Sequence, residues 1–159
     1  MRTNNSKVKN TIISVYFILI VFAILMATVF SAFSDVTDNA TLTFFIMAFS
    51  FAGVFFLVHF ISRYFEYDSD GVKVVIVNRG LLLSEQFNYR EHKIEFEKDN
   101  LVAFKFHNYI IFKSLVIYVK DHKGHKNHET FNVTLVARKK RKYIKQSLSK
   151  MVKNNRKAS

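Results

Sequence analysis

Two long apolar blocks, residues 11–33 and 40–61, dominate the first part of the chain. Neither block contains Asp, Glu, Lys or Arg, and only residues 34–39 separate them. An α-helix rises about 1.5 Å per residue, so each block makes a helix of roughly 33 Å, long enough to cross the ~30 Å apolar core of a bilayer. The pattern therefore predicts a membrane hairpin of two transmembrane helices.

Beyond residue 61 the apolar positions alternate with polar ones. Ile94 and Phe96 lie between charged residues, and Phe131 and Val133 are followed by polar ones. A period of two indicates strands with one buried face, and short connections favour antiparallel hairpins. The predicted strands are residues 72–77, 82–89, 93–97, 101–107, 112–120 and 129–135.

The last predicted element is a helix from Ala137 to about Val152, because Ile144, Leu148 and Met151 share one helical face. The predicted fold is thus a membrane α-helical hairpin followed by a small antiparallel β domain. This domain is a curved sheet or barrel, closed by a C-terminal amphipathic helix. The chain then divides into an N-terminal tail (1–10), a first transmembrane helix (11–33), an extracytoplasmic loop (34–39), a second transmembrane helix (40–61) and one β domain (62–159).

This order of elements resembles that of bacterial pleckstrin-homology-like domains, which often follow a pair of membrane helices directly. The resemblance covers nearly the whole chain and is one of architecture, without a diagnostic motif. It implies a curved sheet or barrel capped by a helix. It also implies a binding or assembly role rather than catalysis.

Charge is divided unequally along the chain. Residues 62–159 hold 21 Lys or Arg and 10 Asp or Glu, a net charge of +11 out of the chain's +12. Three basic residues precede the first apolar block, and Arg63 directly follows the second. Because basic residues favour the cytoplasmic side, we expect both termini in the cytoplasm. The resemblance to bacterial domains implies that the membrane is the bacterial inner membrane. Tyr64, Phe65 and Tyr67 are expected to form an aromatic belt at the membrane surface.

A secretory signal is the alternative interpretation of the N-terminus. Ala32 and Ser34 are small enough to permit cleavage near residue 34. The apolar run before them is about twice the usual length of a signal-peptide core, which favours an uncleaved hairpin.

The strongest local signal is a basic run, with ten Lys or Arg and no acidic residue over positions 138–157. Cations at a helix N-terminus oppose the helix dipole, so helix stability does not explain the run. One interpretation is a binding surface for anionic lipid headgroups or an acidic protein, and the other is a solvated helix face. The candidate contact residues are Arg138, Lys139, Lys140, Arg141, Lys142, Lys145, Lys150 and Lys153.

Other chemistries have little support. The chain lacks cysteine, which excludes disulfides and thiolate chemistry. His122, His125 and His128 lie within one predicted turn, but Lys123 and Lys126 beside them repel a metal cation, so we expect an exposed loop and no cofactor.

Neither nucleic-acid binding nor catalysis is predicted. Phe104, Phe106, Tyr109 and Phe112 have strand spacing that indicates core positions rather than a base-stacking platform. The four glycines are isolated, so no phosphate-binding loop exists, and no Gly-x-Ser-x-Gly or His-Glu-x-x-His motif occurs. We therefore expect a non-catalytic membrane-anchored binding protein, scaffold or accessory subunit. The alternatives are a tethered domain that senses a lipid or small ligand and, third, a membrane enzyme without a recognisable motif.

Overall fold

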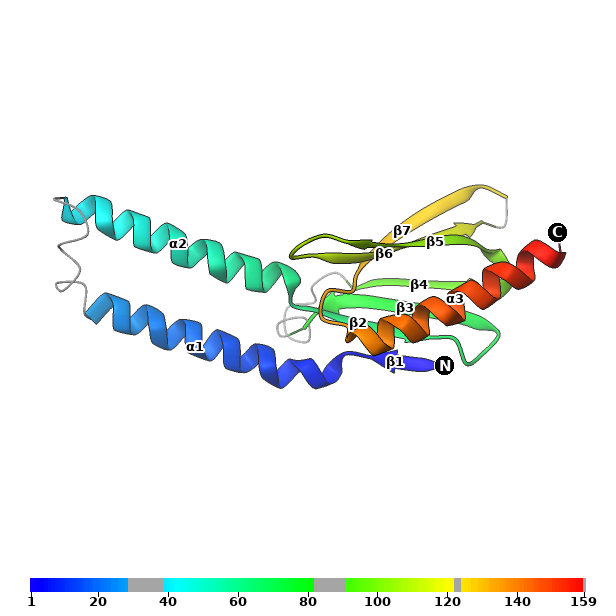
Figure 1. Cartoon of the computed structure of the whole chain (residues 1–159), viewed down its shortest axis with the longest axis horizontal. Helices are drawn as coiled ribbons and strands as arrows, with labels where there is room; N and C mark the ends of the chain where they lie inside the picture. The colour runs from blue at the N-terminus through cyan, green and yellow to red at the C-terminus, as the bar shows by residue number, and fades with distance from the viewer. Residues whose placement is uncertain (29–38, 82–90, 122–123, 159) are drawn as a thin grey trace. The chain divides into compact units, whose positions relative to one another are not determined.

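The computed structural model describes residues 1–28, 39–81, 91–121 and 124–158 (Figure 1). The chain forms two compact units. We call Lys7–Ser62 the helical unit, and Met1–Ser6 together with Arg63–Ser159 the β unit.

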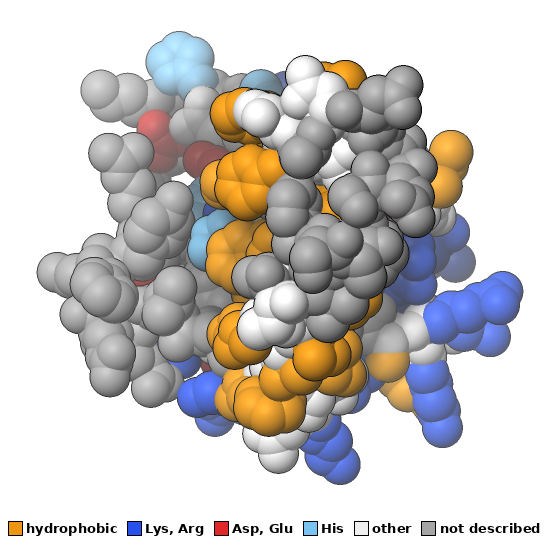
Figure 2. Space-filling view, turned by 90° about the vertical axis from the view of Figure 1, so that its left-hand side faces the viewer, with side chains coloured by type: hydrophobic (Ala, Val, Ile, Leu, Met, Phe, Trp, Pro, Cys, Tyr) orange, Lys and Arg blue, Asp and Glu red, His pale blue; other side chains and the backbone are white. Residues whose placement is uncertain are grey.

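The helical unit consists of α1 (Lys9–Thr28) and α2 (Ala40–Ile61), preceded by the short 3-10 helix η1 (Ser6–Val8). The Asn39 side chain caps α2 by accepting hydrogen bonds from the next turn's backbone. Large apolar side chains are exposed along both helices, and Figure 2 shows hydrophobic side chains gathered over their described part. Two helices, within Ser6–Met26 and Thr41–Ile61, are thus long and apolar enough to cross a membrane. The predicted extracytoplasmic loop and the end of the first span lie outside the described residues, apart from Asn39.

The β unit contains two antiparallel sheets and a C-terminal helix. The first sheet has the strand order β1-β2-β3-β4, and the second has the order β5-β6-β7. The strands are β1 (Arg2–Asn4), β2 (Arg63–Asp68), β3 (Lys73–Gly80), β4 (His92–Glu97), β5 (Leu101–Asn108), β6 (Lys113–Lys120) and β7 (Lys126–Asn132). The 3-10 helix η3 (Lys98–Asn100) joins the sheets, and α3 (Arg138–Ala158) ends the described chain.

These elements confirm the predicted antiparallel β domain and C-terminal helix. The prediction for residues 72–77, 93–97, 101–107 and 112–120 agrees with β3, β4, β5 and β6 to within about three residues at either end. The strand predicted at residues 129–135 begins and ends three residues earlier. The strand predicted at residues 82–89 lies outside the described residues.

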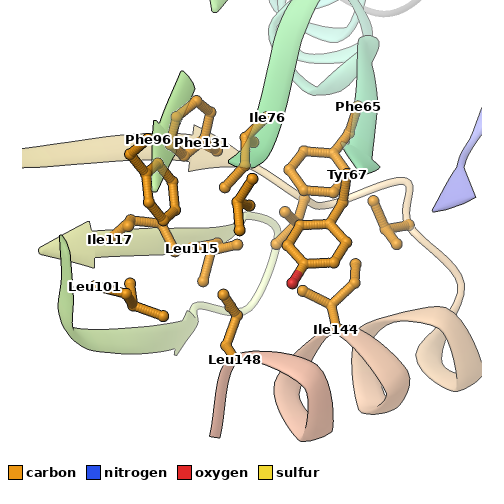
Figure 3. Close-up of a cluster of buried hydrophobic side chains, with 13 residues drawn as sticks. Phe65, Tyr67, Ile76, Phe96, Leu101, Leu115, Ile117, Phe131, Ile144 and Leu148 are labelled. Carbon is orange, nitrogen blue, oxygen red and sulfur yellow. The ribbon is translucent and has the colours of Figure 1, made fainter. Parts of the chain in front are cut away.

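The core lies between the two sheets and α3. Figure 3 shows Tyr67 of β2 lying between Phe65 of the same strand and Ile144 of α3, while Leu148 points toward Leu115 of β6. All five side chains are fully buried. Burial of apolar area at about 25 cal/mol per Å² makes this cluster the main stabilising contact between the sheets and the helix.

Two predictions for the segments that flank the hairpin are wrong. Residues 1–10 do not form a separate tail, because Arg2–Asn4 is the edge strand β1 and pairs with β2. Phe65 and Tyr67 do not form an aromatic belt, because both lie in the core. The physical reason is the alternation of β2, in which these two rings face inward while Glu66 lies between them on the other face.

Candidate functional site

Two segments that are far apart in the sequence meet where the β unit continues into the helices. Asn5, just before α1, is only 2% exposed. Its backbone N–H donates to the carbonyl of Phe65 at 3.2 Å, and its Oδ1 accepts from the Phe65 N–H at 2.9 Å. Its Nδ2 donates to the carbonyl of Arg63 at 2.9 Å. We call this end of the β unit, where Asn5 meets Arg63, the junction end.

A second pair of asparagines ties the second sheet to the junction end. The Asn78 Nδ2 donates to the carbonyls of Tyr64 at 2.9 Å and Asn132 at 3.1 Å. In return, the Asn132 N–H donates to the Asn78 Oδ1 at 3.1 Å. Asn132 pairs with Ser114 at the start of β6, so the β5–β6 turn lies at the same end as the exits to the helices (Figure 1).

The β5–β6 turn presents apolar side chains to solvent. The Tyr109 N–H donates to the carbonyl of Phe112 at 2.8 Å, which closes the turn around Ile110 and Ile111. Ile110 is fully exposed, and Tyr109 and Ile111 are 59% and 55% exposed. We call Tyr109, Ile110 and Ile111 the hairpin tip. The prediction that Tyr109 belongs to the core is therefore wrong, whereas Phe104 and Phe106 do pack against the core.

The first turn of α3 lies beside the same end. The Lys140 Nζ donates to the carbonyl of Asn4, and the Arg141 Nη1 donates to the Asn108 Oδ1 at 3.4 Å. The Arg141 Nε is buried without a hydrogen-bond partner in the described part of the chain. Arg138, Lys139 and Lys142 are exposed around these contacts. The predicted residues 138–142 therefore gather at the junction end.

The rest of the basic run lies elsewhere. The Asn155 Nδ2 donates to the carbonyls of Lys98 at 2.8 Å and Leu101 at 2.9 Å, where the two sheets are joined at the opposite end of the β unit. At about 1.5 Å per residue, Lys153 lies roughly 20 Å along the helix from Lys140. The Debye length is only about 8 Å at physiological salt. A charged surface that contacts the basic residues at one end of α3 therefore interacts only weakly with those at the other end. Lys145 is exposed between them, and Lys150 is exposed toward the opposite end.

No carboxylate among the described residues pairs with the side chains of this basic run. Within the described part of the chain, none of the Lys and Arg side chains of α3 forms an ion pair. The Arg2 Nε instead pairs with the Glu66 Oε1 at 2.9 Å, and the Lys73 Nζ pairs with the Glu95 Oε1 at 3.0 Å. The positive charge of α3 is therefore open to an external anion.

A tyrosine at the junction end has a strongly shifted pKa. The Tyr64 hydroxyl donates to the Glu66 Oε2 at 2.8 Å, and the guanidinium of Arg79 lies 4.9 Å from the centre of the Tyr64 ring. Burial, followed by the hydrogen bond to Glu66, raises the pKa of Tyr64 to about 12. The phenol is therefore neutral at physiological pH.

The opposite end of the β unit contains a cleft of about 250 Å³ between β4 and strands β6 and β7, lined by both charged and apolar side chains. Ligand pockets usually hold about 300–1,000 Å³, so this cleft is small. The Lys73 ammonium lowers the pKa of Glu95 on its rim by hydrogen bonding and charge. Its charged lining residues are Lys73, Glu95, Glu97, Lys120, Asp121 and Glu129.

The predicted histidine turn is described only in part, because His122 lies outside the described residues. His128 faces the Tyr118 ring at 6.0 Å between centroids. In the part of the chain that the structure describes, no three His, Cys, Asp or Glu side chains lie close enough to hold a metal ion.

The hairpin tip is the feature that sequence reasoning missed. Its signal was the segment Tyr109-Ile110-Ile111 between two predicted strands, where turn-forming residues are expected. Comparison of the chain with family models, curated proteins and solved structures found no match. The fold and surface chemistry of this chain therefore carry the functional inference.

Proposed function

We propose that this chain is a membrane-anchored, non-catalytic binding protein, acting as a scaffold or accessory subunit at the inner membrane of a bacterium. In this proposal α1 and α2 cross the membrane and hold the β unit on its cytoplasmic face. The exposed apolar surface of both helices supports insertion, because a contiguous apolar surface of this extent is unfavourable in water.

The observation that carries the proposal is the pairing of β1 with β2 across the hairpin. The chain leaves the β unit after β1 and re-enters it at β2, and Asn5, at the point of exit, bonds Arg63 and Phe65 of β2. Paired strands lie on the same side of a membrane. A segment that joins them and enters the bilayer must therefore cross it an even number of times. The two termini then lie on one side, and the surplus of Lys and Arg in residues 62–159 favours the cytoplasm.

The same pairing argues against a cleaved signal. Cleavage near Ser34 would remove β1 and leave the edge of β2 without its partner strand. It would also remove Asn5, so the buried N–H of Phe65 would lose its hydrogen bond.

A pleckstrin-homology-like fold is the finer part of the proposal. Sheets of four and three antiparallel strands, followed by one helix that buries Ile144 and Leu148 against them, support it. The basic run of α3 supplies a surface for anionic lipid or an acidic protein partner.

Cysteine labelling of the full chain in intact cells tests the proposal, because the natural chain contains no cysteine. A membrane-impermeant maleimide should label Asp38→Cys, between the spans, from outside. It should label Lys153→Cys, on exposed α3, only after lysis. Labelling of Lys153→Cys in intact cells, or recovery of the protein in the soluble fraction, would contradict the proposal.

The cleft between β4 and strands β6 and β7 favours a second candidate, a tethered regulatory domain that senses a small ligand. Native mass spectrometry of the chain extracted gently from membranes tests it. A bound mass that is lost in Glu129→Gln would support ligand sensing. A natural chain that carries no bound mass would contradict it.

A further inference from the structure

The residues of the hairpin tip do not suit a solvent-exposed turn. Tight hairpin turns favour Asn, Asp or Gly, which adopt the required backbone angles without strain. Here the two central residues are Ile110 and Ile111, both β-branched and both exposed. In the described part of the β unit, neither local turn chemistry nor burial explains these two adjacent side chains, and an apolar environment outside the β unit would suit them.

The hairpin tip extends toward the membrane exits. Asn78 and Asn132 bond each other across the two sheets and pair with Phe65 and Ser114 respectively. Phe65 and Ser114 therefore lie at about the same distance from the junction end, and this position is the reference level. At about 3.3 Å per residue, Arg63 lies some 7 Å along β2 from this level. Lys113, the first residue of β6, lies one residue beyond this level toward the same end of the β unit, and the turn that carries Ile111 adjoins it (Figure 1). The hairpin tip thus lies at the same end of the β unit as Arg63, the first residue of β2.

Positive charge surrounds the base of the hairpin tip. Arg141 bonds Asn108 at the start of the turn, and Lys113 follows the turn directly. Arg138 and Lys139 are exposed in the neighbouring first turn of α3. An apolar tip within a basic collar is complementary to a bilayer surface, where acyl chains lie beneath anionic headgroups.

We propose that the hairpin tip inserts into the interfacial region of the membrane that anchors the chain, while the first turn of α3 contacts anionic headgroups. This inference rests on the proposed function, because it requires that α1 and α2 span that membrane. The β unit is then held at three places, namely the two exits and the tip, and has a defined orientation on the bilayer.

The chain contains no tryptophan, so a single Trp reports on one position. The test compares Ile110→Trp with Val72→Trp in full-length protein reconstituted into phosphatidylcholine and phosphatidylglycerol vesicles. Val72 is a matched control, because it is 81% exposed and lies in the β2–β3 turn, beside the pair Lys73–Glu97 at the opposite end. With brominated lipids present, the Ile110→Trp fluorescence should shift to the blue and be quenched. The Val72→Trp fluorescence should show neither change.

Each other outcome overturns the inference. Equal quenching of both variants, or of neither, means that the hairpin tip does not enter the lipid in preference to the opposite end. If Ile110→Trp is unquenched while Asp38→Cys still labels from outside, the tip inference fails and the membrane anchor stands. If the protein does not float with the vesicles, both proposals fail. Ile111→Trp repeats the measurement one residue along, in case Ile110→Trp alters the turn.

Discussion

The two ends of the β unit differ in the pairing of their charged side chains and in the apolar surface that they expose. At the opposite end, the carboxylate of Glu95 pairs with Lys73, and charged groups line an open cleft. At the junction end, Arg138 and Lys139 are exposed without ion pairs in the described chain, beside the apolar hairpin tip. The first arrangement suits contact with water, and the second suits contact with a surface that is both anionic and apolar. The two ends of the β unit therefore have different surface chemistry, which the amino-acid composition alone does not reveal.

The largest effect is expected from breaking the hydrogen bonds that hold the two exits together. Asn5→Ala leaves the buried N–H of Phe65 without its partner and should lower the free energy of unfolding by about 2–3 kcal/mol. Asn155→Ala is the matched control, because its side chain also bonds backbone carbonyls but is partly exposed at the opposite end. It should cost about 1 kcal/mol. Thermal unfolding of the full chain in detergent, followed by circular dichroism, makes the comparison, and equal losses would contradict the special role of Asn5.

Charge reversal on α3 should distinguish its two halves. Lys139→Glu with Lys142→Glu reverses two exposed charges at the junction end, and Lys150→Glu with Lys153→Glu makes the same change toward the opposite end. Because each basic residue near an anionic leaflet contributes about 1 kcal/mol, the first pair should weaken lipid contact more than tenfold. Hydrogen exchange of α3 in nanodiscs should slow when anionic lipid is added. This protection should be lost in the first variant and kept in the second, and a similar loss in both would show that the helix does not distinguish the two ends.

High pH should act on the junction end. Burial raises the pKa of Tyr64 to about 12, whereas an unfolded tyrosine ionises near 10. The folded chain therefore retains a proton that the unfolded chain loses, so stability should fall as the pH rises from about 10 to 12. Tyr64→Phe should make this fall shallower in denaturant titrations at successive pH values. An unchanged slope would mean that Tyr64 titrates normally in the folded chain.

The smallest expected effect is at low pH and at the opposite end. Lys73 lowers the pKa of Glu95 below its ordinary value of 4.5. The stabilisation that follows is fully present above that value and is lost as the pH falls through the lower folded pKa. Because both side chains are well exposed, Glu95→Gln should change the acid limb of the stability profile only slightly. A large change would mean that this ion pair is less screened than its exposure indicates.

Local patterns predicted the parts of the fold that depend on local contacts. The alternation around Ile94 and Phe96 predicts β4, and the helical spacing of Ile144 and Leu148 predicts α3. β1 was not predictable, because it is three residues long, lacks an apolar face and pairs with a strand about sixty residues away. The prediction for the aromatic residues of β2 was wrong because they directly follow an apolar block. In that position, their pattern is as typical of a membrane-surface belt as of a buried strand.

The candidate site was predictable in its chemistry and not in its geometry. The basic run of α3 was evident in the sequence, but its division between two ends follows from Asn155 and Lys140 contacting backbone at opposite ends. The hairpin tip was overlooked because aromatic residues such as Tyr109, next to a strand, usually belong to the core. The absence of Gly, Asn, Asp and Pro from residues 109–112 was the available signal.

A disulfide across β1 and β2 tests the central claim, that the apolar hairpin of α1 and α2 is inserted between two paired strands. Asn4 and Glu66 are directly opposite each other in β1 and β2. The next pair along, Asn5 and Phe65, is hydrogen-bonded, so Asn4 and Glu66 form a non-hydrogen-bonded pair. The side chains of such a pair lie close enough for a disulfide. The variant Asn4→Cys with Glu66→Cys, carrying a protease site between residues 34 and 39, is oxidised in its membrane and then cleaved. Asn4→Cys with Val77→Cys is the control, because β3 lies one strand further from β1.

The pairing predicts that the two fragments of the Asn4→Cys, Glu66→Cys protein stay linked without reductant and separate when reductant is added. The control fragments should separate in both conditions, because a disulfide cannot join Cα atoms more than about 7 Å apart. Separation of the fragments of the Asn4→Cys, Glu66→Cys protein without reductant would contradict the account.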